Sequence, residues 1–202
     1  MYMKKILAGT SAIALSLSMT SVALAATDTD GVNISATVAE NMTVSCGADV
    51  DIDNGGSVTA GTPESNSTTC TVTTNDEDGY NLQIADDNAG SDALVNGSHT
   101  IADKTAWDGA GNAAAWSGTG LGFGVYASTA TKNTTWWGTG SACHDANNLY
   151  AGLPDGDTNI MEHTSYSSNS TTTSVCYRVD VASTQASGEY SGSVTYTATG
   201  RP

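Results

Sequence analysis

The sequence predicts an all-β protein, an antiparallel sandwich of at least six strands with one long loop insertion. Three observations support this fold class. Apolar and polar side chains alternate with a period of two in several segments, turns rich in Gly, Ser and Thr separate these segments, and almost no stretch has helical periodicity. Strands joined by many irregular loops favour an antiparallel sandwich over a parallel sheet.

The first element spans Val32–Cys46, where every even position except Glu40 is apolar. This pattern predicts one long strand, or two shorter strands broken near position 40. Val50 and Ile52 continue the same parity, which places the intervening aspartates on the opposite face. The run ends at the turn signal Asn54–Gly56.

The second group of strands lies on either side of an acidic turn. Cys70 and Val72 begin one strand, Asn75–Gly79 is a turn signal, and alternation resumes over Tyr80–Ile84. A hairpin fits this pattern, and so does a single bent strand. Ser98–Ile101 predicts a further short strand.

The last strands flank a long irregular segment. Leu121–Tyr126 predicts a strand whose glycines indicate a close approach of another backbone segment. Ser128–Thr173 reads as a long loop, and Val175–Val181 is a strand with Cys176 on its outer face. Tyr190–Ala198 predicts the final, half-buried strand.

The first 25 residues have the composition of a secretory leader. Lys4 and Lys5 precede a mostly apolar stretch, and Ala23-Leu24-Ala25 is a small-residue cleavage site. We therefore expect export to the cell surface or the medium, with residues 26–202 as a single domain and no membrane span after cleavage.

The mature chain is strongly acidic. Six basic residues less the two in the leader leave four, against 21 acidic residues, which gives a formal charge of −17. Such a surface repels phosphate, so we expect no nucleic-acid partner.

The four cysteines predict disulfides, because their number is even, the chain carries a leader and no Cys-x-x-Cys spacing is present. Three connectivities are possible. We favour the local pairs Cys46–Cys70 and Cys143–Cys176, which would each stabilise the fold by roughly 3 kcal/mol in the chain-entropy view. The second pair would attach the long loop to the strand that carries Cys176.

Several of these strands resemble those of spore coat protein U-type secreted domains and chaperone–usher pilins, and the last is also similar to the end of WxL-type cell-surface domains. The resemblance rests on the segments Ile34–Val38, Val44–Cys46, Leu121–Tyr126 and Ala186–Tyr196. It implies an immunoglobulin-like sandwich, a disulfide between the first two core strands, and a structural role in a coat, pilus or fimbria built from copies of the chain.

In pilins of this kind, a neighbour's N-terminal strand completes the sandwich. The alternating residues Val32, Ile34, Ala36 and Val38 have the spacing of such a donor strand. The same residues fit an ordinary first strand of their own molecule. We favour the ordinary strand, because only residues 26–31 would precede it in the mature chain.

Catalytic motifs are absent from the sequence. The three histidines lack zinc-site spacing, no Gly-x-Ser-x-Gly segment occurs, and oxidised cysteines offer no thiolate. We therefore expect no enzymatic activity and no obligatory cofactor.

A secreted binding module is the alternative function. Asp155, Asp157, Asn159 and Glu162 offer oxygen ligands for Ca²⁺ in one short loop. The aspartates at 49, 51 and 53 are a weaker calcium candidate, because the alternation around them reads as strand. The adjacent Trp136 and Trp137 are the candidate platform for stacking on a glycan, although packing beneath the long loop is the simpler role for them.

Overall fold

The computed structural model describes residues 30–87, 92–166 and 170–202. The predicted leader, Met1–Ala25, lies outside the described residues. The chain divides into two units, residues 1–37 and residues 38–202. In the first unit, the described residues 30–37 carry no helix and no strand, and all the strands below belong to the second unit.

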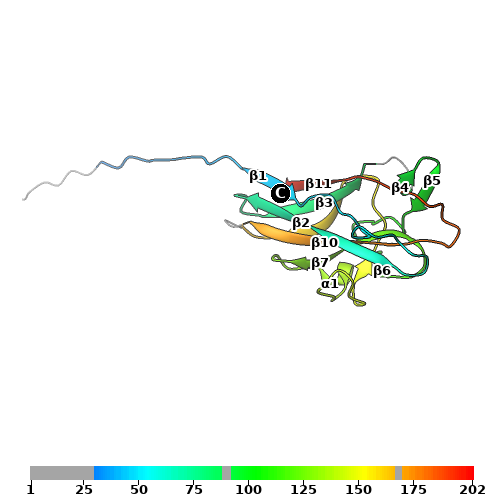
Figure 1. Ribbon diagram of the computed structural model, residues 1–202. Helices are drawn as coiled ribbons and strands as arrows, with labels where there is room; N and C mark the ends of the chain where they lie inside the picture. The colour runs from blue at the N-terminus through cyan, green and yellow to red at the C-terminus, as the bar shows by residue number, and fades with distance from the viewer. Residues whose placement is uncertain (1–29, 88–91, 167–169) are drawn as a thin grey trace, which may run out of the picture. The chain divides into compact units, whose positions relative to one another are not determined.

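Two antiparallel sheets build the second unit, so the predicted all-β sandwich is confirmed (Figure 1). The four-stranded sheet has the order β1-β2-β10-β7, formed by β1 (Met42–Cys46), β2 (Glu64–Thr74), β10 (Thr171–Asp180) and β7 (Gly120–Ser128). The three-stranded sheet has the order β11-β3-β9, formed by β11 (Val194–Gly200), β3 (Tyr80–Asp86) and β9 (Thr158–His163).

Short elements lie outside the two main sheets. One hairpin joins β4 (Asp92–Asn96) to β5 (His99–Ala102), and a two-residue ladder joins β6 (Ala114–Ala115) to β8 (Leu149–Tyr150). The single turn of helix α1 spans Thr134–Trp137 and begins at Asn133, whose side chain accepts hydrogen bonds from the amides of Thr135 and Trp136.

The core lies between the two sheets, where the alternating residues of the strands meet. The fully buried side chains include Val72, Tyr80, Leu82, Ile84, Leu121, Phe123, Val125, Ile160, Met161, Val175 and Val179. Burial of each such aliphatic or aromatic side chain contributes roughly 1.5–3 kcal/mol, so this layer is the main source of stability. The period-2 pattern therefore identified the inner faces correctly.

Three sequence expectations about the strands are wrong. Only the last third of the predicted first element is a strand, β1, because residues 30–41 carry none. Val50 and Ile52 belong to no strand, and Ile52 lies in a turn, since the Asp53 carboxylate accepts from the Gly55 amide and favours a turn over a strand. The final strand begins at Val194, not at Tyr190.

The predicted hairpin across Asn75–Gly79 is also wrong. β2 pairs with β1 and β10, whereas β3 pairs with β11 and β9, so the acidic turn carries the chain from one sheet to the other. Both β2 and β3 carry buried residues. The two strands line the core from opposite sides, which explains why they belong to different sheets.

The glycines of β7 allow the close approach that the sequence predicted. A Cβ atom on Gly124 would lie 2.4 Å from the carbonyl oxygen of Leu149. Phe123 and Ala151 exchange backbone hydrogen bonds of 2.8 and 2.9 Å at this place. The irregular part of the predicted long loop therefore returns to cover the edge of the four-stranded sheet. The expectation of a loop over the whole of Ser128–Thr173 is wrong, because β9 within it is a strand with buried core residues.

Both favoured disulfides are present. Cys46 and Cys70 lie opposite each other in the β1–β2 ladder and are bonded. Cys143 and Cys176 join the long loop to the outer face of β10. Disulfides of this kind fit an oxidising, extracytoplasmic environment.

Candidate functional site

A large groove opens between the two sheets at the end where β1 stops. Its volume is about 1090 Å³. The apolar residues that line it include Leu94, Ile101, Leu121, Leu153, Val179, Val181 and Val194. The groove exists because β1 ends at Cys46 and β11 begins only at Val194, so irregular segments take the place of paired strands there.

Strand edges without a ladder partner flank this groove. β1 pairs with β2 only over Cys70–Thr74, and one further bond joins the Gly47 amide to the Thr69 carbonyl oxygen at 3.0 Å. Beyond that point, Glu64–Thr69 pairs with β10 on one side alone in the described ladders. β11 is likewise the outer strand of its sheet. Such edges can accept another strand.

A pair of tyrosines crosses the groove. The hydroxyls of Tyr177, from β10, and Tyr196, from β11, are hydrogen-bonded at 2.6 Å. Burial raises the pKa of Tyr177 to about 12, because the charged phenolate would lose its hydration. The pKa of Tyr196 also lies well above its ordinary value for the same reason. Both groups are therefore neutral at physiological pH.

The groove rim is acidic. Asp49, Asp51, Asp53 and Glu189 all belong to the segments that line it. The pKa of Asp53 is raised by its contact with Asp51 and by burial, which indicates two carboxylates held close together. The interior of the groove is thus apolar and its entrance negatively charged.

The predicted donor residues are exposed and unpaired in the described structure. Val32, Ile34 and Val38 are 82%, 91% and 82% exposed, and Ala36 is exposed as well. The preference for an ordinary first strand is therefore wrong, since residues 30–41 carry no strand. We call residues 32–38 the arm. The segment 31–39 around it carries no charge, whereas Asp30 and Glu40 flank it.

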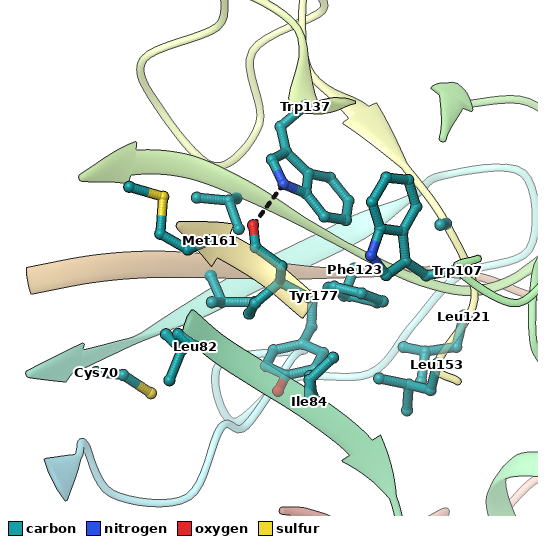
Figure 2. Close-up of a cluster of buried hydrophobic side chains, with 14 of the residues drawn as sticks. Cys70, Leu82, Ile84, Trp107, Leu121, Phe123, Trp137, Leu153, Met161 and Tyr177 are labelled. Atoms are coloured by element: carbon teal, nitrogen blue, oxygen red, sulfur yellow. Dashed lines mark hydrogen bonds between the residues drawn. The ribbon is translucent and has the colours of Figure 1, made fainter. Parts of the chain in front are cut away.

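The predicted glycan platform is contradicted by burial. Trp137 is fully buried, and its indole Nε1 donates to the Ile160 carbonyl oxygen at 2.9 Å (Figure 2). Trp136 is partly buried and packs edge-on against Trp107, with ring centroids 5.5 Å apart. Because Trp137 presents no face to solvent, the adjacent tryptophans do not form a stacking surface.

The indoles instead protect a strand edge. Trp107 is 3% exposed and donates to the Asn159 carbonyl oxygen at 2.7 Å, beside the bond from Trp137 to Ile160. Both acceptors belong to β9, the outer strand of its sheet. No local signal in the sequence pairs Trp107 with Trp137, because the two residues lie far apart along the chain.

The predicted calcium ligands do not converge. Asp157 accepts from the Thr197 hydroxyl at 3.3 Å, while Glu162 forms an ion pair of 3.5 Å with Arg201 and accepts from the Asn159 amide at 3.0 Å. Within residues 30–87, 92–166 and 170–202, no three His, Cys, Asp or Glu side chains gather to hold a metal ion. Asp155 and the aspartates at 49, 51 and 53 therefore belong to no such group.

One further cluster of side chains could not be predicted from the sequence, apart from the glycine on which its aromatic ring packs. Lys104 and Arg178 lie over the ring of Trp116, at 4.4 and 5.2 Å from its centroid. The ring packs against Gly122, where a Cβ would lie 3.1 Å from it. The Lys104 ammonium also donates to the Ser117 carbonyl oxygen. These cation–π contacts fix the segment between β6 and β7, which carries Trp116, against β10.

No family model, curated protein or solved structure matches the chain. No helix in the described part of the chain is long and apolar enough to cross a bilayer.

Proposed function

We propose that the chain is an exported structural subunit of a cell-surface coat or fibre, and that it assembles with copies of itself. In this proposal, the arm of one copy fills the groove of the next. The observation that carries the proposal is the presence, in one chain, of an apolar groove between two sheets and of an exposed, alternating apolar segment. The two disulfides fit a protein that works outside the cytoplasm.

The chemistry of the arm matches that of the groove. In an extended strand, Val32, Ile34 and Val38 project from one face, and the segment 31–39 brings no charge into an apolar interior. The polar residues on the opposite face remain toward solvent. An incoming strand of this kind also finds the free edges of β2 and β11 beside the groove.

Approximate free energies of burial, ordering and hydrogen bonding indicate which interactions must hold the arm in a groove. Burial of its three large apolar side chains contributes roughly 1.5–3 kcal/mol each. Ordering seven residues costs roughly 1–2 kcal/mol per residue in backbone entropy. Apolar contact alone therefore does not suffice, and backbone hydrogen bonds along the groove edges, each worth about 1 kcal/mol, are needed as well.

The length of β1 favours a second copy over the chain's own groove. The groove begins at Cys46, the fifth and last residue of β1, which begins at Met42. If residues 39–41 formed a turn, Val38 would lie opposite Met42 and Ile34 opposite Cys46. Of the arm's large apolar residues, only Val32 would then pass the end of β1, so the chain's own arm reaches the mouth of the groove and leaves its interior empty. A neighbour's arm has no such limit.

The test places a charge on one face of the arm at a time. Ile34→Asp puts a carboxylate on the apolar face, whereas the matched control Ser35→Asp adds the same charge one residue later, on the polar face. We expect the mature wild-type chain and the Ser35→Asp variant to form ordered oligomers in analytical ultracentrifugation and electron microscopy. We expect Ile34→Asp to remain monomeric. Equal assembly of the two variants would refute the arm's role. A wild-type chain that stays monomeric but binds a glycan saturably would favour the binding-module alternative.

A further inference from the structure

Asn75 binds the chain at the base of the arm. It lies directly after β2, and its side-chain oxygen accepts from the Asn41 amide at 2.6 Å, while its side-chain nitrogen donates to the Ala39 carbonyl oxygen at 2.9 Å. Its own backbone amide donates to the Asn41 carbonyl oxygen at 3.2 Å. One residue thus holds two alternate positions of the segment that connects the arm to β1.

The side chain of Asn75 acts here as an extension of the sheet. A carboxamide carries one acceptor and two donors, so it can take the place of a peptide group in a ladder. The β1–β2 ladder ends at the pair Met42 and Thr74. The bonds of Asn75 continue this pattern through Asn41 to Ala39, past the point where β2 itself turns away.

We propose that Asn75 is a positioning residue, which keeps residues 39–41 extended and thereby directs the arm to a second copy. This inference rests on the proposed function. A turn at residues 39–41, which the chain's own groove would require, breaks the side-chain bonds to Ala39 and Asn41. A fixed, extended base also lowers the entropy that the arm loses when it docks on a neighbour.

The fold itself does not depend on the Asn75 side chain. Asn75 is exposed, and the turn that follows is held by other bonds. The Asp76 amide donates to the Thr74 hydroxyl at 3.0 Å, and the Asp78 amide donates to the Asp76 carboxylate at 2.9 Å. An alanine at position 75 also keeps the backbone amide that reaches Asn41.

The experiment compares the full-length mature wild-type chain with Asn75→Ala and Asn75→Asp. Aspartate keeps an acceptor for the Asn41 amide but loses the donor to Ala39. Glu77→Ala, an exposed position in the same turn, is the matched control. Assembly is followed by analytical ultracentrifugation over a concentration series. Groove integrity is measured separately, by the fluorescence anisotropy of a labelled peptide of residues 31–40 bound to each chain at a dilution where the chain is monomeric.

We expect Asn75→Ala to raise the concentration for half-assembly about three- to tenfold, since two exposed hydrogen bonds and part of the preorganisation are lost. Asn75→Asp should be impaired at least as much as Asn75→Ala, because its carboxylate faces the Ala39 carbonyl oxygen without a proton to donate. Glu77→Ala should behave as the wild type, and peptide binding should stay within about twofold for all four proteins. The Asn41 amide should exchange faster with deuterium in Asn75→Ala.

Two results would overturn the inference while the proposed function stands. One is unchanged assembly of Asn75→Ala, and the other is peptide binding that falls in parallel with assembly, which would make Asn75 a part of the groove's structure. If the wild-type chain neither assembles nor binds the peptide, both the inference and the proposed function fail.

Discussion

The tyrosine pair across the groove gives the sharpest test of the packing between the two sheets. Tyr177→Phe removes one hydroxyl and leaves the hydroxyl of Tyr196 without the partner that it now meets at 2.6 Å. An unsatisfied buried hydroxyl costs about 1–3 kcal/mol. Tyr196→Phe should cost a similar amount. The double variant leaves no orphan hydroxyl, so it should lose less than the sum of the two single variants.

The same pair predicts how stability depends on alkaline pH. In the folded chain the pKa of Tyr177 is raised to about 12, against about 10 in the unfolded chain. Above pH 10 the unfolded state therefore binds fewer protons than the folded state. The contribution of Tyr177 is fully present below pH 10 and is lost, by roughly 1.4 kcal/mol per pH unit, as the pH rises toward 12.

The assay is urea unfolding of the four proteins at pH 7 and at several values between 9 and 12. We expect a double-mutant cycle with a coupling of about 1 kcal/mol or more at pH 7. We also expect a shallower alkaline loss of stability in the double variant than in the wild type. The difference between these two proteins isolates the pair, because the raised pKa of Tyr80 affects both alike. Additive single variants with identical pH profiles would refute the buried hydrogen bond.

Three further predictions concern stability and assembly. Replacing Cys46 and Cys70 together by Ser should cost roughly 3.4 kcal/mol, because the bridge spans a sequence separation of 24, and an unchanged urea midpoint would contradict this. Trp137→Phe should lower the free energy of unfolding in urea by about 2–3 kcal/mol, since it removes the hydrogen bond to Ile160 and opens a void. Trp136 is only partly buried, so Trp136→Phe should cost under about 1 kcal/mol, and equal losses for the two variants would contradict this ranking. Assembly should strengthen when the salt concentration rises from about 0.01 to 0.15 M, because the screening length falls from about 30 to 8 Å and the acidic copies repel each other less. Weaker assembly at the higher salt concentration would contradict association through the apolar arm and groove.

The sequence predicted the inner faces of the central strands well. Alternation at Tyr80, Leu82 and Ile84 reflects a face that packs on the opposite sheet, and this pattern is local. The same holds for the strand around Phe123. The disulfide pairs were also predictable as a preference, because short loops between cysteines are easily closed.

Pairing between strands could not be predicted in the same way. The turn at Asn75–Gly79 has the residues of a hairpin, yet the strands on either side belong to different sheets. Turn residues favour a reversal of the chain, and long-range packing decides which strand lies next to which. The prediction of a strand through Val50 and Ile52 failed for a related reason, since Asp51 and Asp53 accept the hydrogen bonds of a local turn.

The candidate site was likewise predictable from the sequence only in part. The arm was visible as alternating apolar residues without charge, but its exposure was not, because period 2 is the same in a paired and an unpaired segment. The groove depends on where β1 stops and where β11 begins, and no local signal marks these ends. Burial of Trp137 agrees with the simpler packing role expected for it, but the strand geometry assumed for the adjacent tryptophans is wrong, because helix α1 turns Trp137 into the core.

Cross-linking between copies tests the exchange of the arm most directly. Ala36, on the apolar face of the arm, is replaced by the photoreactive p-benzoylphenylalanine in chains of heavy isotope content, which are mixed with light wild-type chains before assembly and irradiation. We expect heavy-to-light cross-links from position 36 to residues that line the groove, such as Val181 or Tyr196. Cross-links that join only residues of the same heavy chain, or that reach a light chain outside the groove, would contradict it.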